Sequence, residues 1–112
     1  MDVTLDRNDG ILVVGVIGRM EAGDALDFER TVRTSIEDTD RAVIMDFEEL
    51  AYISSAGLRA VLMTAKNLKK QETAFSVCSL PESVGDVFRM SGLDKIIAVH
   101  ASKADALATL NQ

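Results

Sequence analysis

The sequence predicts a single α/β domain, in which a mixed sheet of about five strands packs with about four helices in the order ββαβαβαβα. Short runs rich in Val, Ile and Leu alternate with longer stretches whose apolar residues recur at helical spacing. The length of 112 residues suits one domain over residues 1–112, and 47% hydrophobic residues are enough to build its core. Strands that alternate with helices imply parallel strand pairs joined by right-handed crossovers.

Two strands joined by a tight turn are expected to open the chain. Polar and apolar residues alternate over Val3–Arg7, as in a half-buried strand. The turn sequence Asn8-Asp9-Gly10 follows, with a glycine that can adopt a positive φ, and then comes the β-branched run Ile11–Ile17. An antiparallel hairpin is therefore predicted, which makes the sheet mixed, and residues 18–23 are expected to form a loop.

A helix and a central strand are predicted next. The helix should run from Ala25 to about Glu37 with Asp24 as its N-cap, because its apolar residues share one face. The run Ala42–Phe47 is apolar almost throughout, which is typical of a strand covered on both faces. Residues 48–53 are expected to connect this strand to the next helix.

The second half of the chain repeats the alternation of helix and strand. Its expected elements are a long helix from Ser54–Gly57 to about Lys70, a strand Ala74–Leu80, a helix Pro81–Met90, a strand Ile96–Val99 and a helix Lys103–Leu110 capped by Ser102.

Charge and cysteine content narrow the classes of function. A net charge of −6 and a pI of about 4.6 argue against partners that are nucleic acids or anionic membranes, and favour a protein partner with a basic patch. The same charge could equally do no more than keep a cytoplasmic protein soluble. The single cysteine, Cys78, and the single histidine, His100, offer neither an internal disulfide nor a metal site. With no signal-peptide pattern and no long apolar run, a cytoplasmic location is expected.

The most informative segment, Asp46–Arg59, places two adjacent hydroxyls at the start of the long helix. A helix start carries unpaired N–H groups and the positive end of the dipole, so a phosphate on Ser54 or Ser55 would suit it. Ala56 and Gly57 are small enough for another protein to approach closely. A purely structural interpretation is also open, in which Ser54 is an N-cap and Ser55 an ordinary first-turn residue.

This segment resembles the signature of the anti-sigma factor antagonist family, within the STAS domain superfamily. The resemblance covers nearly the whole chain, and the segments that carry it are residues 42–70, Val84–Ile97 and the Gly18-Arg19-Met20 loop. The family motif often reads Asp-Ser-(Ser/Thr)-Gly. In this chain Ser54 stands at the Asp position, Ser55 at the phosphorylated serine and Ala56 at the next hydroxyl position, while Gly57 and Leu58 match.

The resemblance implies a STAS fold and a partner switch. The unphosphorylated form would bind and sequester an ATP-using serine kinase that is also the anti-sigma factor, phosphorylation of Ser55 would release that kinase, and a PP2C-type phosphatase would reset the switch. Alignment through Gly57 favours Ser55 over Ser54 as the acceptor, whereas the physical argument alone does not separate them. The missing Asp removes a carboxylate beside the acceptor and could alter kinase recognition. The expected partner-binding residues are Ser54, Ser55, Ala56, Gly57, Leu58, Asp24 and Tyr52.

Catalysis and a constitutive adaptor role are the two alternatives to the switch. Catalysis is disfavoured because the chain lacks a Gly-x-Ser-x-Gly elbow, a glycine-rich phosphate loop and metal-ligand spacing, so no catalytic residue, metal or cofactor is expected. A constitutive adaptor subunit with a STAS-like fold and no phosphorylation is the alternative function.

Overall fold

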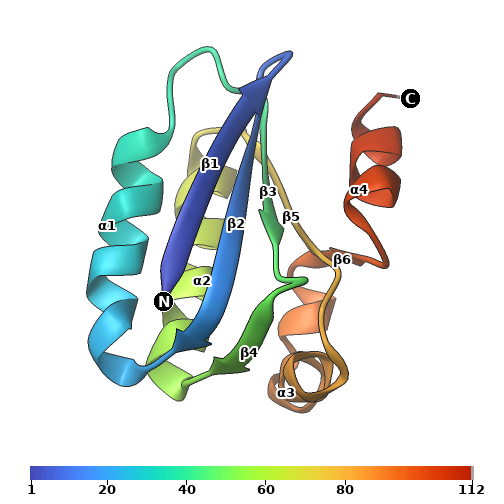
Figure 1. Cartoon of the computed structure of the whole chain (residues 1–112). Helices are drawn as coiled ribbons and strands as arrows, with labels where there is room; N and C mark the ends of the chain where they lie inside the picture. Colours follow the sequence, from blue (N-terminus) through green and yellow to red (C-terminus); the bar gives the residue numbers. More distant parts are fainter. Residues whose placement is uncertain (112) are drawn as a thin grey trace.

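A computed structural model describes residues 1–111 of the chain and confirms the predicted fold class (Figure 1). Within these residues the strands are β1 (Asp2–Asn8), β2 (Ile11–Met20), β3 (Ala42–Asp46), β4 (Leu50–Ile53), β5 (Ala74–Cys78) and β6 (Ala98–His100). The helices are α1 (Ala25–Ser35), α2 (Ser55–Lys70), α3 (Glu82–Ser91) and α4 (Lys103–Leu110), with short 3₁₀ turns η1 (Ala22–Asp24) and η2 (Leu93–Lys95).

The sheet has the strand order β1-β2-β3-β5-β6, and β4 pairs with the far end of β2. β1 and β2 are antiparallel, and every other pair is parallel, as the alternation of strands and helices predicts. The hairpin turn has positive φ at both Asp9 (56°) and Gly10 (74°), the conformation that matches the twist of two-residue hairpins. The predicted mixed sheet and opening hairpin are therefore confirmed.

Residues 48–53, expected as a connecting segment, instead contain a sixth strand. β4 runs parallel to the last residues of β2, with Tyr52 opposite Arg19 and Ile53 opposite Met20. A register shift between Gly18 and Arg19 lets β2 continue to Met20, through residues that were expected to be a loop. The strand was missed because it is only four residues long and its buried residues lie at its two ends instead of alternating.

The expected N-cap of the first helix is also corrected. Asp24 makes no capping hydrogen bond to α1. It belongs to η1, where its Oδ2 accepts a hydrogen bond from the Glu21 amide at 2.9 Å as part of a capping box. A short 3₁₀ turn thus precedes the helix and takes the carboxylate that would have capped it.

Several predicted ends move by one to a few residues. α1 ends at Ser35, two residues early, because Ile36 is extended and the Ser35 carbonyl accepts a hydrogen bond from the Arg7 guanidinium at 2.6 Å. β6 begins at Ala98 because η2 and a helical Ile96 occupy the residues before it. β1 extends one residue beyond its predicted bounds at each end, whereas β3 ends one residue early and β5 two residues early. α3 is shifted by one residue.

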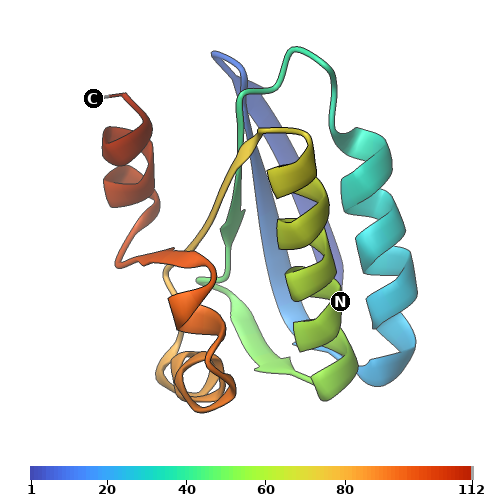
Figure 2. The same cartoon turned by 180° about the vertical axis from the view of Figure 1, so that it is seen from behind.

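Two layers of helices cover the sheet unequally (Figures 1 and 2). α1 and α2 lie side by side on one face, with their N-termini at the same end, and bury the main core, which includes Phe28, Phe47 and Phe88. The rings of Phe47 and Phe88 meet edge to face at 6.1 Å, which ties α3 to the end of the sheet beside β4. On the other face α4 covers a smaller core, in which Cys78 is fully buried. This arrangement brings the ends of β2 and β4 and the starts of α1 and α2 to one end of the molecule.

Candidate functional site at the start of α2

β4 leads the chain directly into α2, so Ser54 and Ser55 lie where the sheet ends and the helix begins. The Ser54 amide donates to the Met20 carbonyl at 2.9 Å, which anchors the junction to the end of β2. Ser54 keeps an extended backbone (φ −77°, ψ 168°), and Ser55 is the first residue of the helix. The predicted start of this helix and its end at Lys70 are confirmed.

The Ser54 side chain is part of the fold. Its Oγ accepts a hydrogen bond from the Gly57 amide at 3.1 Å, and its carbonyl accepts one from the Leu58 amide at 2.9 Å. Only 7% of Ser54 is exposed. Ser54 is therefore the N-cap of α2, and a phosphate on its hydroxyl would break the cap and require a buried charge.

Ser55 has the opposite environment. The residue is exposed, and within residues 1–111 its hydroxyl has no hydrogen-bond partner in the structure. The first turn of α2 contains no acidic residue, so nothing in it compensates the positive end of the helix dipole. An anion attached to Ser55 would meet a favourable field without displacing any contact of the fold.

The small residues that follow the serines pack inward more than sequence reasoning expected. Gly57 is buried, and a Cβ at this position would lie 2.8 Å from both Met20 Sδ and Ile53 Cγ1. The absence of a side chain at Gly57 thus serves the close packing of α2 on β2 and β4, not an outer contact surface. Ala56 and Leu58 are half-buried against the main core and leave only part of their surface to a partner.

Tyr52 and Asp24 lie at the same end of the molecule through different elements. Tyr52 is 39% exposed, and the guanidinium carbon of Arg19 lies 4.4 Å from the centre of its ring. The Arg19 Nε is 2.7 Å from Glu21 Oε1, and Glu21 pairs with Asp24 in the capping box of η1. The Arg19 contact was missed because it depends on the pairing of β2 with β4, for which the sequence carries no local signal.

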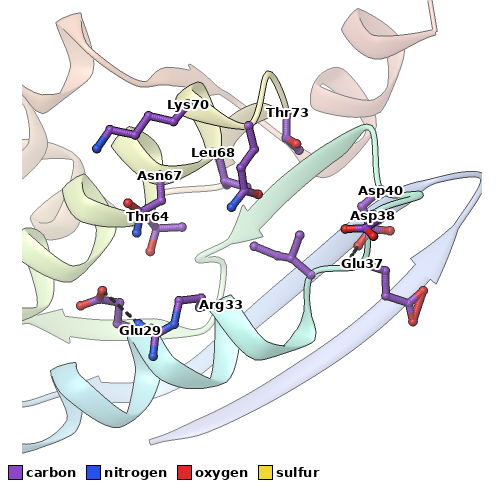
Figure 3. Close-up of a pocket in the computed structure, with 12 residues that line it drawn as sticks. Glu29, Arg33, Glu37, Asp38, Asp40, Thr64, Asn67, Leu68, Lys70 and Thr73 are labelled. Atoms are coloured by element: carbon purple, nitrogen blue, oxygen red, sulfur yellow. Dashed lines mark hydrogen bonds and ion pairs between the residues drawn. The ribbon is translucent and has the colours of Figure 1, made fainter.

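The molecule also has a groove away from this end, between the C-terminal halves of α1 and α2 (Figure 3). It has a volume of about 500 Å³, and none of the predicted site residues lines it. Arg33 and Glu29, both on α1, form an ion pair at 3.7 Å on one wall of the groove. They face Asn67 and Thr64 of α2 on the opposite wall. The groove and the serine pair are thus separate features at opposite ends of the two helices.

The described part of the chain has neither a cluster of metal-binding side chains nor a membrane-spanning helix. Residues 1–111 contain no group of three or more His, Cys, Asp or Glu side chains arranged to hold a metal ion. No helix within the same residues has both the length and the apolar character needed to cross a bilayer.

This chain is similar to known proteins over nearly its whole length. The model of the STAS domain family matches residues 2–106. BtrV of Bordetella bronchiseptica, which is named as an anti-sigma factor antagonist, is 35% identical over 108 residues that cover 96% of this chain and 93% of BtrV. An anti-sigma factor antagonist structure from Mycobacterium paratuberculosis has a TM-score of 0.89 at 23% identity, over 99% of this chain and 94% of that one.

SpoIIAA of Bacillus, also an anti-sigma factor antagonist, has been solved in two states that share this fold. Its unphosphorylated form has a TM-score of 0.83 at 20% identity, over 98% of this chain and 96% of SpoIIAA. Its phosphorylated form has a TM-score of 0.75 at 19% identity, over 97% and 99% of the two chains. The family model and the relationship to BtrV together show that this chain belongs to the STAS domain family, among its anti-sigma factor antagonists.

Proposed function

We propose that this protein is the antagonist in a partner switch controlled by phosphorylation of Ser55. The unphosphorylated form binds and sequesters a serine kinase that also serves as the anti-sigma factor, and phosphorylation releases that kinase. The observation that carries the proposal is the contrast between the two serines. Ser54 is buried and its hydroxyl caps α2, whereas Ser55 is exposed and its hydroxyl has no hydrogen-bond partner within residues 1–111.

The chemistry of the switch is a phosphoryl transfer and its hydrolytic reversal. The kinase moves the γ-phosphoryl group of ATP to Ser55 Oγ, with loss of the hydroxyl proton and release of ADP. A PP2C-type phosphatase then uses water to break the phosphate ester, which restores the hydroxyl and releases inorganic phosphate. Because both reactions occur on the partner enzymes, this chain acts as a binding protein and not as an enzyme. Dependence on ATP and on both enzymes suits the cytoplasm.

The phosphate acts on binding and leaves the fold in place. It adds about −1.5 to −2 charges at a helix N-terminus, where the dipole tolerates them. In a complex that covers Ser55 the same charges would lose their water, which costs several kcal/mol unless the partner supplies a counter-charge. The phosphate would also occupy volume that the partner needs. Release of the partner is therefore expected without unfolding of this protein.

The proposed contact surface surrounds Ser55 at the shared end of β4, α1 and α2. Tyr52 is partly exposed, and Ala56 and Leu58, which are half-buried, follow Ser55 in the first turn of α2. Asp24 stands half-exposed at the entrance of α1. The names of BtrV and SpoIIAA support an anti-sigma factor as the partner, and the two states of SpoIIAA support phosphorylation as the signal.

The first experiment is intact-mass analysis of the protein from its own cells, with peptide mapping of residues 42–70. We expect a fraction that is heavier by one phosphoryl group (about 80 Da), with the group on Ser55. In binding assays with the kinase, Ser55→Ala should keep the interaction and Ser55→Asp should lose it. Phosphate found only on Ser54 would keep the switch but show that Ser54, not Ser55, is the acceptor. No phosphate in any growth condition, even with the phosphatase inhibited, would favour the constitutive adaptor instead.

A further inference from the structure

Arg59 differs from every other arginine in the chain. The sequence has seven arginines, and six of them form ion pairs with carboxylates: Arg7, Arg19, Arg30, Arg33, Arg41 and Arg89. Among the described residues Arg59 has no such partner, although it is exposed and the chain has a net charge of −6. An arginine that stays unpaired in so acidic a protein has its guanidinium available for another anion.

The position of Arg59 on α2 indicates which anion it could bind. Arg59 follows Ser55 by four residues on α2, so the two side chains lie on the same face of the helix, with Cβ atoms about 6 Å apart. An acidic group that precedes a basic group at this spacing has the more favourable orientation for a helical ion pair. The amides of Ser55 and Ala56 also have no acceptor within residues 1–111, so two free donors belong to the same first turn as Ser55.

We infer that Arg59 is the charge partner of the phosphate on Ser55, an inference that rests on the proposed function. The guanidinium donates a pair of charge-assisted hydrogen bonds to the phosphate oxygens and holds the group over the first turn of α2. This pairing favours the dianion over the monoanion, so a larger share of the phosphorylated protein carries the dianion near neutral pH. Arg59 is thus a positioning residue that shapes the released state, and the unmodified protein does not need it for its fold.

The test uses the full chain with phosphoserine placed at position 55 during translation, so that no kinase is required. Titration of the ³¹P resonance gives the midpoint of the second phosphate ionisation. Replacement of Arg59 by Gln should raise this midpoint by roughly 0.3 pH unit, because the dianion loses its partner. Arg59→Lys should recover part of the shift, since lysine keeps the charge but not the planar pair of donors.

Lys66→Gln is the matched control, because it removes one exposed positive charge from the same helix far from Ser55. It should leave the midpoint unchanged. An equal midpoint in the parent and in Arg59→Gln would overturn the inference. So would equal shifts in Arg59→Gln and Lys66→Gln, since the effect would then come from net charge alone.

The same samples separate this inference from the proposed function. If the phosphoserine protein still binds the kinase as tightly as the unmodified one, the switch is wrong, while the titration still reports on Arg59. If Arg59→Gln leaves the titration unchanged but weakens binding of the unmodified protein, Arg59 contacts the partner and the inference fails.

Discussion

Ser54 and Ser55 are neighbours in the chain, yet their hydroxyls lie in opposite environments. Ser54 is extended and turns its hydroxyl inward to the Gly57 amide, whereas Ser55 enters the helix and leaves its hydroxyl in solvent. The difference follows from the N-cap position itself, which has non-helical dihedrals and directs its oxygen to the amides of the first turn. A kinase would reach Ser55 without disturbing the helix, and would have to undo the cap to reach Ser54.

The cap gives a prediction at the residue scale. Ser54→Ala should lower the free energy of unfolding by about 1 kcal/mol, because the Gly57 amide loses its acceptor. Ser55→Ala, one residue away, should change it little, since the Ser55 hydroxyl has no partner in the described structure. Urea denaturation followed by circular dichroism measures both. Equal losses in the two variants would contradict the assignment of Ser54 as the cap.

At the scale of elements, the start of α2 depends on its close approach to the ends of β2 and β4. Gly57 makes that approach possible, because a Cβ there would lie 2.8 Å from Met20 Sδ and Ile53 Cγ1. We expect Gly57→Ala to destabilise the protein by about 1–3 kcal/mol through overpacking. Gly23→Ala is the control: within residues 1–111, no atom beyond its two chain neighbours lies within 4 Å of the added Cβ, so its stability should be equal to or above the parent's. Thermal denaturation measures the stability of both variants. A Gly57→Ala variant as stable as the parent would contradict the packing account.

A second element-level contact ties β1 to the corner that follows α1. The guanidinium of Arg7 donates to both carboxylate oxygens of Asp40, at 2.7 and 2.8 Å, and to the carbonyl of Ser35. The Asp40 side chain is fully buried, and its Oδ2 also accepts a hydrogen bond from the Glu37 amide. The Arg7 hydrogen bond is the main cause that lowers the pKa of Asp40. This contact was not expected from the sequence, because 33 residues separate the pair.

The pKa of Asp40 gives a prediction of pH dependence. A pKa that is lower in the folded than in the unfolded state stabilises the fold above the unfolded value of about 3.9, and this contribution is lost as pH falls through the folded value. Asp40→Asn should therefore be less stable than the parent at pH 7, and the difference should shrink below about pH 4. The exposed Asp38→Asn is the control and should match the parent. Urea denaturation at pH 7 and pH 3 measures the free energy of unfolding of each variant. If the difference in stability between the parent and Asp40→Asn is the same at both pH values, the pKa of Asp40 is not linked to stability in this way.

At the scale of the whole molecule, the sheet separates a large core under α1 and α2 from a small one under α4. Cys78 lies in the small core, and burial raises the pKa of its thiol to about 11. As the only cysteine, it should react with a disulfide reagent at pH 8 at a rate limited by unfolding. In urea the rate should rise along the same transition as circular dichroism. Fast reaction of the native protein would show that α4 opens independently of the main core.

Sequence patterns could predict the alternation of elements because hydrophobic periodicity reports local burial, and the long α2, with its serine start, was found almost to the residue. The same patterns missed β4, whose partner strand lies some 30 residues earlier in the chain, and misplaced the capping role of Asp24. They also left Ser54 and Ser55 equivalent on physical grounds, because burial at a helix start depends on where the neighbouring strands end. The ion pair of Arg7 with Asp40 and the stacking of Arg19 on Tyr52 are tertiary contacts of this kind.

The most direct test of the switch is calorimetric titration of the cognate serine kinase with two forms of this protein, unmodified and carrying phosphoserine at position 55. We predict that the phosphate weakens binding at least ~100-fold, about 3 kcal/mol, because a desolvated charge would enter the interface. Circular dichroism should show the same fold in both forms. Equal affinities for two equally folded forms would contradict the account, since Ser55 would then lie outside the surface that binds the kinase.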